Sequence, residues 1–515
     1  MNGAEVMVST MVAAGMGPCF ANPGTTELHL VAALDAVPGS RAVLGTFEGV
    51  CTGAADGYGR MADRPAWTLL HLGPGLANGA ANLHNARRAR TPLVSVVGDH
   101  ATWHRIADAP LTTDLAGLAA PVSDQVIQTG TAGAVAKDLV KAASAAARGQ
   151  VVTLLVPADH SWGPSEAAGL DTVPDVTLRR DRPGTETVEQ AAAAVRAAQR
   201  PLLLLGGTGC RAGGLRAAAA TGVELLVETF PARWERGGDL PAPGKLQYVR
   251  ELAGDQLARH DLVLLAGARP PVSFFGYPGR PSALTAEHQQ VRTLAGPDED
   301  AAAALADLAA ALAADGTGAG SAAERRHAAP RPQRPTGALD LTTLGAAVAA
   351  LQPEGAIVVD ESNTSGVAYT QAAAGAAPHT TLSLTGGAIG FGPPAATGAA
   401  VACPDRPVIN LQADGSALYT LQALWTQARE GLDVTTVICA NDSYRILRYE
   451  LGRLGAQDGR AAIGLTDLGH PATDWVALAA GFGVPGRRAG TADELTEALA
   501  VALSEPGPHL VEARL

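Results

Sequence analysis

The sequence predicts an α/β protein made of three doubly wound domains, each built around a parallel sheet. Short apolar runs rich in β-branched residues alternate with segments of helical periodicity along the chain, as in sheets whose strands are connected by helices. A chain of 515 residues is too long for a single hydrophobic core. Polar, proline-containing connectors interrupt the pattern at 165–187 and 316–337. We therefore expect domains at 1–165, 185–318 and 336–515.

The composition is that of a globular protein with an excess of acidic side chains. Hydrophobic residues make up 47% of the chain, and 38 basic against 50 acidic residues leave a formal net charge of −12. This charge disfavours a binder of nucleic acid or of anionic membranes. The sequence contains no uninterrupted run of about 18 apolar residues, so we do not expect a membrane span. Five cysteines without CxxC spacing, and an N-terminus without basic residues ahead of its apolar part, favour a cytoplasmic protein with reduced thiols.

The expected elements follow from apolar runs and their flanking turn residues. In the first domain we expect helices at 5–14 and 47–60, and strands at 19–21, 42–45, 67–72, 93–97 and 151–156. The middle domain should contain strands at 202–206, 223–227 and 262–266, and the last domain strands at 357–359, 382–384, 408–411, 434–439 and 509–512. The glycine-rich segment 206–214 lacks the GxGxxG spacing, so we do not expect a dinucleotide there.

The most informative stretch is 408–446, which is expected to form strand, turn, helix and strand. Apolar residues between 418 and 428 recur with helical spacing, and polar residues follow each strand. Asp414 comes after the first strand and Asn441 after the second, so both should lie at the carboxyl edge of the sheet, where ligands of such sheets bind. A carboxylate, an amide oxygen and a backbone carbonyl suit Mg²⁺ holding a phosphate. The alternative is two ordinary turns, because Asp, Asn, Gly and Ser are common in turns.

This stretch resembles the signature of thiamine-diphosphate (ThDP) enzymes, which begins GDG and ends NN, although Ala413 and Ala440 depart from it. Further motifs extend the resemblance over the whole chain: NPGTTE (22–27), FEGVCTGAADGYGR (47–60), LHLGPG (70–75), DESNTSG (360–366) and SLTGGAIGFGPPAATGA (383–399). The chain resembles benzoylformate decarboxylase and the related acetolactate-synthase-like proteins. The resemblance implies a pyrimidine-binding, a middle and a diphosphate-binding domain, with ThDP and Mg²⁺ as cofactors.

The resemblance also assigns cofactor roles to individual residues. Glu48 would hydrogen-bond to N1′ of the cofactor's aminopyrimidine, in an apolar setting made by the small residues that follow it. Mg²⁺ would be held by Asp414, the Asn441 side chain and the Ser443 carbonyl. The diphosphate would be contacted by Asn363, Thr364, Gly415 and Ser416, and the pyrimidine by Gly387 and Ile389. Tyr444 is a further candidate cofactor-binding residue. Structural alternatives exist: an acidic residue favoured in a first helical turn for Glu48, a loop cap for Asn363 and Thr364, and core packing for Ile389.

The resemblance also points to residues that would contact the substrate. By resemblance, Thr25 would meet the substrate carboxylate and His71 would transfer protons, although His71 could be an ordinary hydrogen-bonded residue at a strand end. The family's second histidine should fall within 270–279, where this chain has Phe274 and Phe275 instead. His100 and His104 are candidate substitutes, or simply a solvated pair.

The function implied by the resemblance is decarboxylation of a 2-oxo acid or C–C bond formation, through an enamine (acyl-anion) intermediate on C2 of ThDP. FAD-independent acetolactate synthesis is one alternative, since no FAD-contacting segment is recognisable. A non-catalytic ThDP-binding subunit is another. The resemblance further implies a homodimer or homotetramer with active sites between chains.

Overall fold

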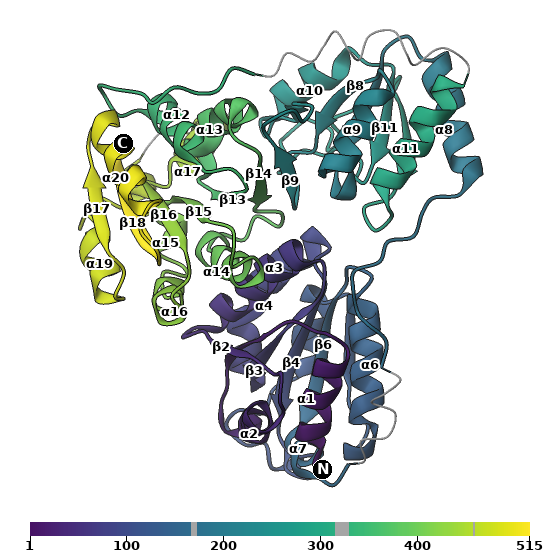
Figure 1. Cartoon of the computed structure of the whole chain (residues 1–515), viewed down its shortest axis with the longest axis vertical. Coiled ribbons are helices and arrows are strands. Elements are labelled where there is room, and N and C mark those ends of the chain that lie inside the picture. Colours follow the sequence, from purple (N-terminus) through teal and green to yellow (C-terminus); the bar gives the residue numbers. More distant parts are fainter. Residues whose placement is uncertain (166–172, 315–328, 457–458) are drawn as a thin grey trace. The chain divides into compact units, whose positions relative to one another are not determined.

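The computed structural model describes residues 1–165, 173–314, 329–456 and 459–515. Most of the predicted connector at 316–337 and part of that at 165–187 lie outside the described residues. The chain forms two compact units, one of Met1–Arg179, Pro332–Ala372 and Leu384–Leu515, the other of Arg180–Arg331 and Ala373–Ser383. Three sheets are present, as predicted, and the exact domain boundaries stay a prediction (Figure 1).

The first sheet is parallel, with strand order β2-β1-β3-β4-β6-β5. Its strands are β1 (Cys19–Asn22), β2 (Ala42–Leu44), β3 (Ala66–His71), β4 (Leu93–Asp99), β5 (Gln125–Gln128) and β6 (Val151–Pro157). The helices are α1 (Gly3–Ala13), α2 (Leu28–Ala36), α3 (Glu48–Ala62), α4 (Leu72–Ala89), α5 (Leu115–Ala119), α6 (Val135–Ala146) and α7 (Ala158–Trp162). Apolar residues of α1, α2 and α6 form one core with one face of this sheet, and α3 and α4 pack against β3 and β4. The central strands β3, β4 and β6 are buried on both faces and are accordingly almost entirely apolar.

The middle sheet has the order β10-β8-β7-β11-β12. It comprises β7 (Pro201–Leu205), β8 (Glu224–Val227), β10 (Gly244–Lys245), β11 (Leu262–Ala266) and β12 (Gln290–Ala295), with helices α8 (Thr185–Ala197), α9 (Ala212–Ala220), α10 (Arg250–Ala258) and α11 (Ala301–Ala313). The strand that we expected at 382–384 is present as β14 (His379–Ser383). It pairs antiparallel with β9 (Trp234–Arg236), and both belong to the second unit.

Within the first unit, the strands of the last sheet are, in spatial order, β17 (Gly486–Ala489), β18 (His509–Arg514), β16 (Val434–Ala440), β15 (Val408–Ala413) and β13 (Ile357–Glu361). The accompanying helices are α12 (Leu341–Leu351), α13 (Val367–Ala372), α14 (Gly392–Ala402), α15 (Asp414–Ala417), α16 (Ala423–Glu430), α17 (Arg445–Arg453), α18 (Arg460–Thr466), α19 (Trp475–Gly481) and α20 (Ala492–Ala502). β15 and β16 are parallel neighbours, as expected. The helix predicted between them from the apolar spacing at 418–428 begins later than expected, at Ala423, because the chain turns after α15 and the Thr420 hydroxyl donates to the Gly390 carbonyl at 2.9 Å.

Helices α3 and α14 of the first unit meet at backbone contact. A Cβ atom on Gly57 of α3 would lie 2.1 Å from the Ala395 carbonyl oxygen, and one on Gly398 of α14 would lie 1.8 Å from that of Ala54. Neither position can carry a side chain without separating the helices. Glu48 begins α3 and Gly392 begins α14, so this packing sets the distance between two of the segments that carry candidate site residues.

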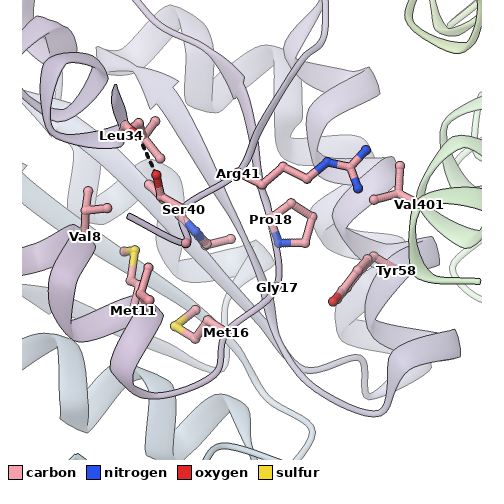
Figure 2. Close-up of a pocket in the computed structure, with 13 residues that line it drawn as sticks. Val8, Met11, Met16, Gly17, Pro18, Leu34, Ser40, Arg41, Tyr58 and Val401 are labelled. Carbon is pink, nitrogen blue, oxygen red and sulfur yellow. Dashed lines mark hydrogen bonds between the residues drawn. The ribbon is translucent and has the colours of Figure 1, made fainter. Parts of the chain in front are cut away.

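A pocket of about 200 Å³ lies at the amino ends of the first sheet's strands. Pro18 and Arg41, which immediately precede β1 and β2, lie beside Tyr58, and a cluster that includes Met11 and Met16 lines the other side (Figure 2). The candidate site residues of this domain lie at the carboxyl ends of the same strands, so the pocket is separate from them. Within the described ranges, every helix is too short or too polar to cross a lipid bilayer.

Candidate active site

The first group of candidate residues lies where the strand order of the first sheet reverses. The chain passes from β1 to β2 on one side and then to β3 on the other side of β1. The carboxyl edge of the sheet at such a reversal is where open α/β sheets bind ligands. Asn22 ends β1 and His71 ends β3. The NPGTTE and LHLGPG segments are therefore neighbours at this edge.

His71 is paired with a buried carboxylate that sequence reasoning missed. Its Nδ1 atom lies 2.8 Å from Oε2 of Glu27, whose side chain is 0% exposed. Glu27 also accepts hydrogen bonds from the Gly24 amide (2.8 Å) and the Thr26 hydroxyl. A Cβ on Gly24 would lie 2.3 Å from the His71 ring, so glycine is needed for the ring to pack here. Because the Glu27 carboxylate accepts, Nδ1 donates and Nε2 remains for other partners.

Thr25, the predicted contact of the substrate carboxylate, is exposed in the short 3₁₀ turn Thr25–Glu27. Thr26 lies closer to the histidine, with Oγ1 3.2 Å from Nδ1 of His71. The role of Thr25 stays a prediction.

Glu48 occupies the first turn of α3. Phe47 before it is extended, with φ −155°, and the helix continues to Ala62. The Glu48 side chain is buried, and its Oε2 accepts a hydrogen bond of 3.0 Å from Nδ2 of Asn78 on α4. Gly75 leaves room on the other side, since a Cβ there would lie 3.3 Å from Oε1 of Glu48. The Asn78 amide therefore orients the Glu48 carboxyl group, a role that the sequence motifs did not indicate.

Asp414 binds the ends of two neighbouring strands together. Its Oδ2 accepts from the backbone amides of Asn441 (2.8 Å) and Asp442 (2.7 Å), and its Oδ1 accepts from Gly415 (2.7 Å). Burial raises the pKa of the carboxyl group above its ordinary value, and these three amides oppose the shift. The expected proximity of Asp414 and Asn441 is present in the structure.

The oxygen atoms at this edge fit a divalent cation. Oδ1 of Asn441 is buried and has no hydrogen-bond partner within the described part of the chain. The Ser443 carbonyl accepts one bond, from the Arg445 amide at 2.8 Å, and keeps its second lone pair. With the Asp414 carboxylate these are hard oxygen donors of the kind that Mg²⁺ prefers. A buried acceptor without a donor is costly unless a ligand satisfies it.

The predicted diphosphate contacts gather at the same edge. Nδ2 of Asn363, in the loop after β13, donates to Oγ of Ser416 at 3.0 Å, and Thr364 follows in the same loop. Asn363 has a left-handed backbone with φ +52°, a conformation that Asn tolerates better than most residues. Gly415 is required by Tyr444, because a Cβ at 415 would lie 2.4 Å from the Tyr444 ring.

The predicted pyrimidine-binding segment, Gly387 to Ile389, lies in a loop that leads into α14. Gly387 is exposed with φ +76°, and Ile389 is half-buried. Glu361, at the end of β13, accepts from the amides of Gly390 (2.8 Å) and Gly392 (2.7 Å). Burial raises the pKa of Glu361. Sequence reasoning missed this residue, since its partners follow it by about 30 positions.

Aromatic residues stand where the family's second histidine was expected, and the two candidate substitute histidines follow β4. In the second unit, Phe274 and Phe275 are 46% and 52% exposed and lie in edge-to-face contact, with ring centroids 5.0 Å apart. Phe274 also contacts Phe230 and Tyr248. In the first unit, the rings of His100 and His104 lie 5.3 Å apart after β4.

Comparison with known proteins agrees with this arrangement. The family model "Thiamine pyrophosphate enzyme, N-terminal TPP binding domain" matches residues 1–116, and its C-terminal TPP binding domain counterpart matches 363–513. The chain is 52% identical to the "Putative acetolactate synthase large subunit IlvX" of Mycobacterium tuberculosis, over 99% of this chain and 98% of that protein. It is 29% identical to benzoylformate decarboxylase of Pseudomonas aeruginosa, over 97% and 96% of the two chains.

A solved structure, the ThDP-dependent 4-hydroxybenzoylformate decarboxylase of Rhodococcus jostii RHA1, has a TM-score of 0.83 at 26% identity. The match covers 100% of this chain and 99% of that one. The same family is indicated by the fold, by the matches to both cofactor-binding domain models and by the relative that is 52% identical over nearly its full length. The chain therefore belongs to the thiamine pyrophosphate-dependent enzyme family of decarboxylases and acetolactate synthases.

Proposed function

We propose that this protein is a Mg²⁺- and ThDP-dependent enzyme that decarboxylates a 2-oxo acid or joins its acyl group to an acceptor. The observation that carries the proposal is Glu48, a buried carboxyl group at the start of α3 whose orientation is set by Asn78. A protein that only bound the cofactor would not need an acid oriented in this way. Two of the similar proteins are named as decarboxylases of benzoylformate and of 4-hydroxybenzoylformate. These names support a 2-oxo acid as the substrate of this chain.

The residues divide the work of holding the cofactor. Asp414, the Asn441 side-chain oxygen and the Ser443 carbonyl would hold Mg²⁺, and Asn363, Thr364, Gly415, Ser416 and Tyr444 would contact the diphosphate. The Gly387 carbonyl and the Ile389 side chain would receive the aminopyrimidine. Bound ThDP supplies the electron sink that carbanion chemistry requires.

The proton-transfer residues lie in the first domain. Glu48 would hydrogen-bond to N1′ of the pyrimidine, and His71 would give or take protons through Nε2, because Glu27 holds its Nδ1. Thr25 would contact the substrate carboxylate. Assembly into a homodimer or homotetramer, with sites completed between chains, and a cytoplasmic location belong to the same proposal.

The test is turnover of a broad 2-oxo-acid panel by the purified protein with ThDP and Mg²⁺, followed by CO₂ release. Release from at least one acid, dependent on both cofactors, supports the proposal. No release from any member, although ThDP binds, would favour a non-catalytic binding subunit. Acetolactate synthesis is favoured by the name of the 52% identical relative, and colour from acetoin after acid treatment of a pyruvate reaction would detect it.

A further inference from the structure

Helix α4 carries three asparagines on one face that the proposed chemistry does not use directly. Asn78, Asn82 and Asn85 are four and three positions apart, a spacing that stacks side chains along one side of a helix. Asn82 and Asn85 are 2% and 0% exposed. Buried amides are retained where their hydrogen bonds are satisfied, and the partners of these amides are candidate site segments.

Asn85 binds both sides of one residue in the pyrimidine-binding loop. Its Nδ2 donates to the Ala388 carbonyl at 2.8 Å, and its Oδ1 accepts from the Ala388 amide at 3.2 Å. The loop approaches so closely that a Cβ on Gly386 would lie 2.6 Å from Oδ1 of Asn85. In a trans peptide the N–H and the preceding C=O point in opposite directions. Because the Ala388 N–H faces Asn85, the Gly387 carbonyl points away from α4.

The other two asparagines extend this network to Glu48. Asn82 Nδ2 donates to the carbonyls of Gly49 (2.9 Å) and Gly390 (3.2 Å), and its Oδ1 accepts from Asn85 at 2.9 Å. One turn earlier, Asn78 donates to the Glu48 carboxyl group at 3.0 Å. All of these residues belong to the first unit. One helix face therefore contacts both the predicted acid and the predicted pyrimidine-binding loop.

We propose that the asparagine face of α4 positions the groups of this chain that recognise the aminopyrimidine of ThDP. Asn85 turns the Gly387 carbonyl outward to accept from the exocyclic amine, Asn78 orients the carboxyl group of Glu48, and Asn82 keeps α3, α4 and the loop in register. These are positioning residues, since each acts through another group. The inference rests on the proposed function, because it names which part of that cofactor the face serves.

The experiment compares two ligands that share a diphosphate but not a pyrimidine. ThDP and inorganic pyrophosphate, each with Mg²⁺, are titrated into wild type, Asn85→Ala and Asn78→Ala, with binding followed by calorimetry. We expect Asn85→Ala to weaken ThDP about tenfold and Asn78→Ala to weaken it several-fold, since each loses a hydrogen bond that orients a binding group. Pyrophosphate affinity should stay unchanged, because the Asp414 edge is untouched. Arg88→Ala, an exposed change on the same helix, is the matched control and should bind both ligands normally.

Equal ThDP affinity in wild type and both asparagine variants would overturn the inference and leave the proposed function standing. Parallel loss of ThDP and pyrophosphate would also overturn it, since that pattern reports general disruption. Wild type that binds pyrophosphate with Mg²⁺ but not ThDP would overturn both. If Asn85→Ala does not fold, the exposed Asn78→Ala decides alone: an unchanged ratio of the two affinities there contradicts the inference.

Discussion

The Nδ1 atom of His71 lies 2.8 Å from a carboxylate oxygen of Glu27 that no solvent reaches, although 44 positions separate the two residues in the chain. The pair is formed because Asn22 and His71 end neighbouring parallel strands. A histidine held in this way presents a defined nitrogen to a ligand. The imidazole itself is 23% exposed, so its free nitrogen can reach a substrate.

Replacing Glu27 by Gln should lower turnover on the order of 100-fold, which is the usual contribution of a positioned acid–base group. The amide can donate as well as accept, so the His71 ring loses its single hydrogen-bonding arrangement. The measurement is kcat for CO₂ release with the best 2-oxo acid. ThDP affinity serves as the control and should stay within a few-fold of wild type, whereas an unchanged kcat would show that the pair does not support proton transfer.

Glu48→Gln separates cofactor binding from chemistry. Gln retains the shape of the side chain and a partner for Asn78, so the protein should still bind ThDP. It cannot supply the acidic proton, and we expect turnover to fall by about 10³-fold. The two measurements are ThDP titration and CO₂ release on one preparation. Wild-type turnover in this variant would remove the basis of the proposed function.

Asn441→Ala should weaken Mg²⁺-dependent pyrophosphate binding by about tenfold or more without destabilising the protein. The Asn441 oxygen has no hydrogen-bond partner within the described residues, so its removal costs the folded protein no side-chain bond and relieves a buried acceptor. We expect the free energy of unfolding in urea, without ligands, to change by less than about 1 kcal/mol. A variant that is clearly destabilised yet binds Mg²⁺ and pyrophosphate normally would show that Asn441 is a structural residue.

His379 should make stability depend on acidity. Burial, and next the charge of Arg236, lower the pKa of His379 from 6.5 to about 4. The unfolded chain therefore binds a proton more readily than the folded protein, and the stability contributed at neutral pH is lost as the pH falls from 6.5 toward 4. The loss amounts to about 3 kcal/mol.

Urea unfolding at a series of pH values between 7 and 4 measures this loss. The variant His379→Asn keeps a donor for the Ala377 carbonyl, which the histidine binds at 2.8 Å, and should flatten the pH dependence. His288→Asn, at an exposed position, is the control and should follow wild type. If the His379→Asn and wild-type curves run parallel, the buried histidine does not account for the acid sensitivity.

The sequence predicted the buried central strands because their signal is local, and it missed less apolar strands such as β5 and β12. Val408–Ala413 and Val434–Ala440 are mostly apolar and rich in β-branched residues, with polar residues following each, and a parallel sheet buried on both faces favours this pattern. The positions of Asp414 and Asn441 followed from that pattern and from the pairing of adjacent strands.

Interactions between distant segments could not be read in the same way. Glu27 reads as one acidic residue in a turn, and only the fold brings His71 to it. The break between α15 and α16 depends on the Thr420 contact with Gly390, 30 positions earlier, whereas local periodicity favours one helix. The asparagines of α4 did leave a signal, since amides that recur at helical spacing among small and apolar residues indicate hydrogen-bond partners on that face.

The glycine contact between α3 and α14 has a consequence for how the cofactor arrives. Gly57 and Gly398 allow backbone contact between α3 and α14. The spacing between Glu48, at the start of α3, and the loop that leads into α14 at Gly392 is therefore fixed by this packing before any ligand is present. Binding to a surface of this kind loses little conformational entropy and requires no slow rearrangement of the two helices. Cofactor association should therefore follow a single-step, concentration-linear rate law for this part of the site.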